Sequence, residues 1–136
     1  MWEGVGVGEK DFSYRNLIVW QKSMQLSRLV YAIVRKFPTD ERYAFSDQLR
    51  RAVVSIASNI AEGCGRASSK DYAHFLSIAR GSLYETMTQL EMALAFGYID
   101  SIDEAEQLSS EIGRILTSLL KKYGAVRSTT TTSDYA

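Results

Sequence analysis

The chain has 136 residues and a mass of 15.3 kDa, the size of one domain, with 46% hydrophobic and 24% charged residues. These fractions are ordinary for a soluble globular protein and argue against a disordered or fibrous chain. Sixteen basic residues balance sixteen acidic ones, so the net charge does not by itself indicate a nucleic-acid or membrane partner. No stretch approaches the roughly 18 apolar residues of a membrane span, and the N-terminus lacks the pattern of a signal peptide. We therefore expect a cytoplasmic protein with no membrane partner.

Histidine and cysteine, which supply many general bases and metal ligands, are nearly missing. The chain has one of each, His74 and Cys64. One cysteine excludes an intramolecular disulfide, and one histidine cannot supply the two Glu-x-x-His pairs of a di-iron bundle. Only Arg66 lies near Cys64 in the sequence to favour a thiolate, so we expect an inert side chain. The sequence thus predicts that the protein is not an enzyme, with no catalytic residue, no metal site and no cofactor.

The first predicted helix covers about residues 16–36 and ends before Pro38, because a proline disfavours the α conformation in the residue before it. It carries two apolar series that each advance by three, four or seven residues, as one face of a helix does. The first series is Leu17, Trp20, Met24, Tyr31 and Val34, and the second is Val19, Leu26, Val30, Ile33 and Phe37.

The second predicted helix begins near Ser46, a favourable N-cap residue, and ends between Gly63 and Gly65. We expect these glycines at a helix end because glycine tolerates left-handed backbone angles. One face of this helix is apolar, with Leu49, Val53, Ile56 and Ile60 at helical spacing. Another face carries a polar stripe, for which we expect a packing or contact role, formed by Arg51, Ser55, Ser58 and Glu62.

Two further helices follow. The third begins at Ser68, which with Asp71 resembles a capping box, and ends at Gly97. The fourth begins at Ser101, with Glu104 three residues later, and ends at Gly124. Apolar residues recur at steps of three and four throughout both segments.

Four helices of similar length with short connections predict an all-α fold, an antiparallel up-down four-helix bundle over residues 15–124. We expect residues 1–14 to form a flexible leader and the polar residues 125–136 to be disordered.

The first helix has more apolar surface than one bundle member needs, because its two series exceed a stripe of about 100°. A neighbouring subunit that covers the first series is one explanation, with the contact formed by Leu17, Trp20, Met24 and Tyr31. The alternatives are that the segment with Trp2, Phe12 and Tyr14 folds back over this face, or that the face is exposed.

Several blocks of the sequence resemble one known family. They occur in order within residues 12–123: VWQK at 19–22, QLRRAVVSI at 48–56, SNIAEG at 58–63 and GSLYET at 81–86. The chain is similar to the small bacterial four-helix-bundle proteins encoded in intervening sequences of 23S ribosomal RNA genes. That family commonly has a proline where this chain has Ala57, and the change favours a straighter second helix.

The resemblance implies a ring-like homo-oligomer, a pentamer. More distantly, the chain is similar to the accessory variability proteins of diversity-generating retroelements, which are pentamers of this fold that bind a reverse transcriptase and its template RNA. On this basis we expect a non-enzymatic oligomeric scaffold or accessory protein that binds RNA or an RNA-handling protein such as a reverse transcriptase. Those relatives are strongly basic, whereas this chain is neutral.

Charge is nevertheless uneven along the chain. Residues 10–51 hold nine basic and four acidic residues, a balance of +5, and residues 85–136 hold four basic and eight acidic residues, a balance of −4. The candidate RNA-binding residues in the basic half are Arg15, Lys22, Arg28, Arg35, Arg50 and Arg51. In the alternative interpretation these cations pair with the acidic fourth helix, and the protein is an interaction module for proteins only, with no nucleic-acid contact.

Overall fold

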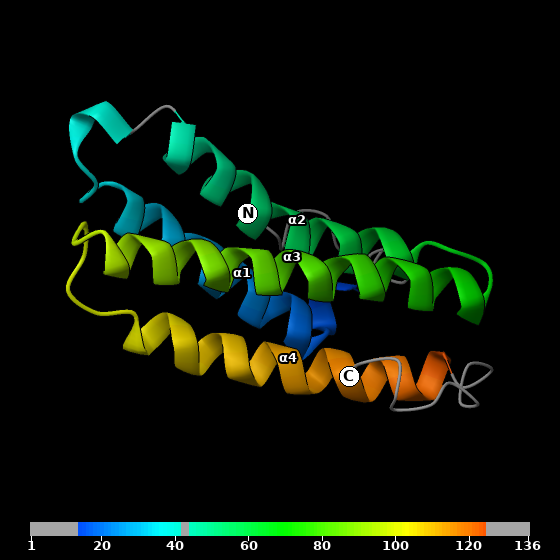
Figure 1. Ribbon diagram of the computed structural model, residues 1–136. Coiled ribbons are helices and arrows are strands. Elements are labelled where there is room, and N and C mark those ends of the chain that lie inside the picture. Colours follow the sequence, from blue (N-terminus) through cyan, green and yellow to red (C-terminus); the bar gives the residue numbers. More distant parts are fainter. Residues whose placement is uncertain (1–13, 42–43, 125–136) are drawn as a thin grey trace, which may run out of the picture.

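The computed structural model describes residues 14–41 and 44–124, which form four long helices and short 3-10 stretches at residues 14–16 and 39–41 (Figure 1). From residue 18 onward these are, in chain order, α1 (Ile18–Val34), η2 (Thr39–Glu41), α2 (Ala44–Cys64), α3 (Ser69–Ala95) and α4 (Asp103–Tyr123). The described part of the chain contains no strand, which confirms the all-α prediction. The predicted polar tail, and the predicted leader except for Tyr14, lie outside the described residues.

The helices are arranged as an up-down bundle. Each helix packs against its neighbour in the sequence, and α4 closes the bundle against α1 (Figure 1). α1 and α3 therefore lie diagonally across the bundle, as do α2 and α4. This order follows from the short connections, since each helix returns alongside the preceding one.

The core consists of the apolar series that the helical periodicity predicts. Every helix contributes side chains with almost no exposed surface, and each such leucine or isoleucine stabilises the fold by about 1.5–3 kcal/mol. The largest fully buried side chains include Leu26, Leu49, Ile56, Ile60, Leu76, Leu83, Leu90, Ile112 and Leu116.

The start of α2 differs from the prediction. The helix begins at Ala44, two residues earlier than expected, and Ser46 is buried in its first turn instead of acting as the N-cap. Phe45 stacks on Phe37 with ring centroids 5.6 Å apart. We attribute the early start to this stacking, which anchors the first turn to the end of α1, so that packing outweighs the capping preference of a serine.

Gly97 ends α3 by a hydrogen-bonding pattern that requires a glycine. Its φ is +80°, the only positive φ among the described residues. The amide of Gly97 donates to the Leu94 carbonyl at 3.0 Å, and the amide of Tyr98 donates to the Ala93 carbonyl at 2.9 Å. This is a Schellman motif, and it confirms the predicted end of the helix.

The other predicted helix ends are confirmed in part. The Ser68 hydroxyl accepts a hydrogen bond from the Asp71 amide at 3.1 Å, as expected at the start of α3. The Ser101 hydroxyl instead accepts from Asp103, two residues later, and α4 begins at Asp103. Gly124 follows α4 and donates its amide to the Leu120 carbonyl at 2.7 Å.

Gly63 has a different role from the one predicted. It lies inside α2 with an ordinary φ, so no left-handed conformation explains it. A Cβ atom built at this position would lie 2.9 Å from both the Cβ of Phe75 and the Cδ1 of Tyr72 on α3. The missing side chain therefore allows α2 and α3 to approach closely.

We expect Gly63→Ala to destabilise the protein by about 1–3 kcal/mol, because the new methyl group overlaps α3. Gly81→Ala is the matched control, since Gly81 is exposed within α3 and nothing lies within 4 Å of a Cβ there. That control should stabilise the helix by about 0.5–1 kcal/mol. Urea denaturation measures both changes, and equal stability of the two variants would contradict the close approach at Gly63.

Candidate nucleic-acid interface

Two predicted RNA-binding arginines lie on the outer surface formed by α1 and its end: Arg28 is in the helix, and Arg35 is its C-cap residue. Arg28 and Arg35 are seven residues apart, about two helical turns, and both side chains are exposed. Neither forms an ion pair with any described residue. Their guanidinium groups are therefore available to an anionic partner.

Arg15 joins this face across a shallow hollow of about 320 Å³. The hollow is lined by Arg15, Trp20, Gln21, Met24, Gln25 and Arg28. The Gln21 side-chain amide donates to the Arg15 carbonyl at 2.8 Å, which ties the segment before α1 to the helix. We call Arg15, Arg28 and Arg35 the α1 arginine row.

Lys22 does not belong to this row. Its Nζ lies 2.8 Å from Glu111 Oε1, at the seam between α1 and α4. The hydrogen bond from Lys22 is the largest of the effects that lower the pKa of the Glu111 carboxyl. For Lys22, the predicted alternative of pairing with the acidic fourth helix is the one observed.

Arg50 and Arg51 lie on α2, apart from the α1 arginine row. The Arg50 guanidinium is 3.2 Å from Asp47 Oδ1, and its carbon lies 5.6 Å from the centroid of the Tyr31 ring. Tyr31, expected at a subunit contact, thus shares a surface with a predicted RNA-binding residue. Arg51 is exposed and forms no ion pair with the described residues.

The predicted subunit-contact residues are not equally exposed. Trp20 is only 8% exposed and packs edge-on against Tyr14, with ring centroids 5.2 Å apart. The indole of Trp20 is covered by its own chain, so the apolar character of Trp20 requires no partner subunit. Leu17 and Met24 are partly buried, and Tyr31 is exposed. Of the segment that the alternative prediction folds back over this face, Tyr14 contacts Trp20, whereas Trp2 and Phe12 lie outside the described residues.

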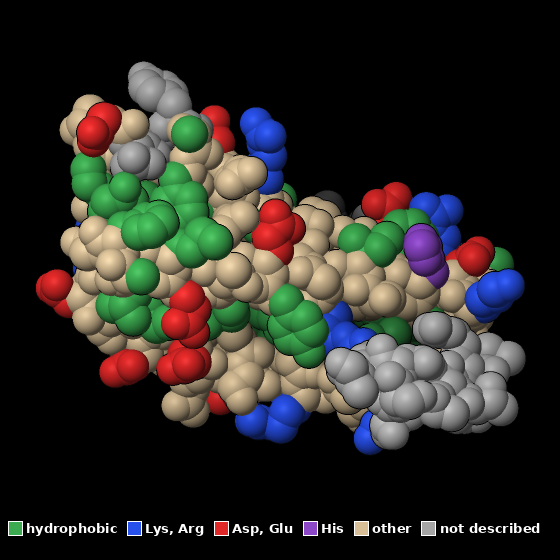
Figure 2. Space-filling view, viewed as in Figure 1, with side chains coloured by type: hydrophobic (Ala, Val, Ile, Leu, Met, Phe, Trp, Pro, Cys, Tyr) green, Lys and Arg blue, Asp and Glu red, His purple; other side chains and the backbone are tan. Residues whose placement is uncertain are grey.

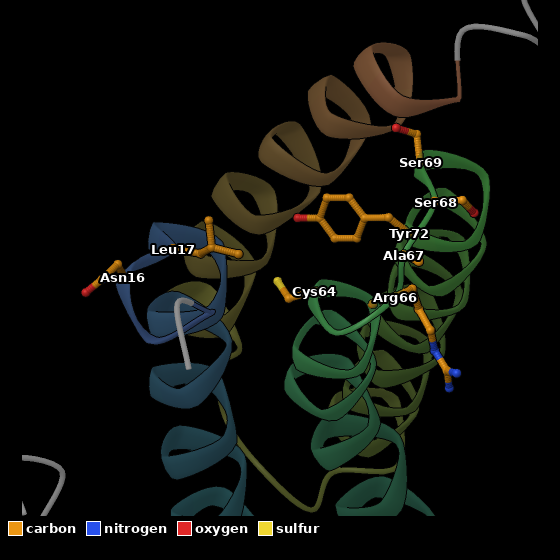
Figure 3. A pocket seen from close by; sticks show the side chains of 9 residues that line it. Asn16, Leu17, Cys64, Arg66, Ala67, Ser68, Ser69 and Tyr72 are labelled. Atoms are coloured by element: carbon orange, nitrogen blue, oxygen red, sulfur yellow. The ribbon is translucent and has the colours of Figure 1, made fainter. Parts of the chain in front are cut away.

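A larger hollow lies elsewhere and contains the cysteine. It has a volume of about 500 Å³ and lies where α1 begins, α2 ends and α3 begins (Figure 3). Burial raises the pKa of the Cys64 thiol, and a hydrogen bond with Tyr72 acts in the opposite direction but is the smaller effect. Arg66 points away from the sulfur, bonds Glu62 at 3.4 Å and lies over the Phe75 ring. Cys64 is therefore a protonated thiol near neutral pH.

The remaining candidates for chemistry are His74 and the side chains that could ligate a metal ion. His74 is exposed beside the ring of Phe75. Among the described residues, no three His, Cys, Asp or Glu side chains converge as metal ligands. None of the described helices is long and apolar enough to cross a membrane.

Comparison with known proteins identifies the family. The chain belongs to the 23S rRNA-intervening sequence protein family, whose model matches residues 15–119. It is also similar to the crystal structure, at 1.70 Å resolution, of a protein of unknown function from the S23 ribosomal protein family of Bacteroides thetaiotaomicron VPI-5482. The two chains share 27% identity with a TM-score of 0.68, over 76% of this chain and 99% of the other. A search of curated proteins gives no match. The resemblance drawn from the sequence blocks is confirmed.

We expect Glu111→Gln to lower the free energy of unfolding at pH 7, because it removes the carboxylate that Lys22 contacts. The pKa of Glu111 is lower in the folded protein than in the unfolded chain. The stabilisation by the contact between Lys22 and Glu111 is therefore fully present above the unfolded-state pKa, and it is lost as the pH falls through the folded-state pKa. The difference from wild type should vanish in acid. Glu91→Gln is the control, since Glu91 is exposed and forms no hydrogen bond or ion pair with described residues. A pH-independent difference, measured by urea denaturation at several pH values, would contradict this role.

Proposed function

We propose that this protein is a non-enzymatic, oligomeric accessory protein of the cytoplasm that contacts RNA through the outward face of α1. The observation that carries the proposal is the α1 arginine row, in which Arg28 and Arg35 are exposed and lack acidic partners among the described residues. The family name, which refers to an intervening sequence of 23S rRNA, supports an association with RNA.

The geometry of the row suits a phosphate backbone. Two exposed guanidinium groups about two turns apart are separated by roughly 10 Å along the helix axis, so they meet different phosphates of one RNA. The hollow beside them offers the partly buried Met24 and the amides of Gln21 and Gln25, which suit contacts with a base or a ribose. Each site is weak by itself, and repetition in an oligomer multiplies the affinity.

The oligomeric part of the proposal is a ring-like pentamer. It is supported by the family resemblance and by large apolar side chains that the isolated subunit leaves exposed, among them Val54, Met92 and Phe96.

Light scattering of the purified protein should give a mass about five times the 15.3 kDa of one chain. The measurement should be made at several concentrations, because a ring that dissociates on dilution would show a falling mass. A mass of one chain at all concentrations would contradict an oligomer.

RNA binding is tested by fluorescence anisotropy with a labelled structured RNA at two salt concentrations. We expect Arg28→Glu to weaken binding by about tenfold or more and to reduce the salt dependence, because phosphate contacts are lost. Lys70→Glu is the control, since it makes the same charge change at an exposed position in the first turn of α3, a helix that has no contact with α1. Equal loss in both variants would indicate a general charge effect and contradict a site on α1.

A second candidate function is an interaction module for proteins only, which includes docking on an RNA-handling protein such as a reverse transcriptase. The observation in its favour is an exposed aromatic surface at the end of α3, where acidic residues predominate. A wild-type protein without salt-dependent RNA binding would leave this function as the better explanation.

A further inference from the structure

An exposed aromatic cluster lies where α3 ends and α2 begins. We call it the α3 end patch, and it consists of Phe45, Met92, Phe96 and Tyr98. Phe96 is 60% exposed and Met92 43% exposed, while Phe45 and Tyr98 are partly buried. Figure 2 shows apolar side chains gathered over this end of the molecule. Such a contiguous exposed cluster is typical of an interaction site.

The rings of the patch hold one another in place. The Phe96 centroid lies 5.6 Å from that of Tyr98 and 6.1 Å from that of Phe45. Phe45 in turn stacks on the buried Phe37, and Tyr98 lies 5.5 Å from the same ring. The surface is therefore preorganised, so binding there costs little side-chain ordering.

The surroundings of the patch are acidic. Residues 81–113 contain no lysine, arginine or histidine. The acidic residues of this stretch are Glu85, Glu91, Asp100, Asp103, Glu104, Glu106 and Glu111. Figure 2 shows acidic side chains on several sides of the apolar surface. An occupant of the patch therefore combines apolar side chains with basic ones.

The chain itself carries a surface of that chemistry. We call it the α2 basic patch, and it consists of Tyr31, Arg50, Arg51 and Val54. Tyr31 and Val54 are exposed apolar side chains, and the Arg50 guanidinium lies over the Tyr31 ring. Arg51 is exposed and forms no ion pair with described residues. This patch lies on the side of the bundle where α1 meets α2, whereas Met92 and Phe96 lie at the end of α3, which has no contact with α1.

We infer that the α3 end patch of one subunit binds the α2 basic patch of a second copy of this chain. The inference rests on the oligomer proposed above and states which surfaces meet. Because the two patches consist of different residues, the contact is head-to-tail, and a closed ring uses both patches of every subunit. Arg28 and Arg35 border this contact, because Tyr31 lies between them at helical spacing on the same helix surface.

The experiment uses two single variants, each disabling one patch. Phe96→Glu places a carboxylate in the α3 end patch, and Val54→Glu places one in the α2 basic patch. Both positions are exposed in the subunit, so circular dichroism should show unchanged helicity. By light scattering we expect each variant alone to fall to the mass of one chain. Tyr84→Glu is the control, since Tyr84 is also exposed on α3 at 58% but is not part of the patch, and it should keep the wild-type mass.

Mixing the two variants gives the decisive measurement. Phe96→Glu keeps an intact α2 basic patch and Val54→Glu keeps an intact α3 end patch, so one good contact forms between them. We expect a one-to-one complex with twice the mass of one chain. Two monomeric variants that do not combine would overturn the head-to-tail contact.

The other outcomes separate the two proposals. A monomeric wild type contradicts the oligomer itself. An oligomeric wild type whose mass Phe96→Glu leaves unchanged overturns this inference and leaves the oligomer in place. If Phe96→Glu loses helicity, it is replaced in each of these measurements by Met92→Glu. Met92 lies one turn earlier in the same patch.

Discussion

The close approach of α2 and α3 is the contact on which the surfaces of this protein depend. At one end of the seam Gly63 lets α2 lie directly against Phe75 and Tyr72 of α3. Near its middle the hydroxyls of Ser55 and Ser82 form a hydrogen bond of 2.8 Å, so part of the polar stripe of α2 faces α3 instead of solvent. The small side chains along this seam set the register of the two helices, because larger ones would hold them apart.

That register determines what the two ends of the bundle present. At one end it brings Phe45, at the start of α2, against Phe96, just after α3, and creates the α3 end patch. At the other end it places Cys64 beside Tyr72 and forms a hollow of about 500 Å³, where partial burial raises the pKa of the thiol. The first end thus offers a rigid apolar surface for a partner, whereas the second offers no activated nucleophile.

The zero net charge of the chain conceals two polarised surfaces. The bundle order places basic α1 beside acidic α4, and Lys22 and Glu111 neutralise each other at that seam. Arg28, Arg35 and Arg51 are exposed and form no ion pair with the described residues. In the proposed assembly the acidic surface of one subunit meets the basic patch of the next. Arg28 and Arg35 border that contact, and they are the cations that the proposed function assigns to RNA.

The sequence by itself determined the helices, the core and the family. Apolar residues at steps of three and four predicted which side chains are buried, because a helix with one apolar stripe has only one way to remove it from water. Gly97 and Ser68 marked helix ends, because left-handed φ and N-terminal capping are local requirements of the backbone. The blocks around Val19, Gln48, Ser58 and Gly81 resemble the family whose model matches residues 15–119.

Only the tertiary structure decided what each surface residue contacts. Trp20 and Tyr31 belong to one apolar series, yet Tyr14 covers the first and Arg50 lies over the second. Lys22 and Arg28 are both cations of α1, but only Lys22 faces a carboxylate across the bundle. Phe45 and Phe96 are separated by fifty-one positions and form one patch. The physical reason is that these contacts depend on how neighbouring helices are placed relative to one another, which the periodicity of a single helix does not encode.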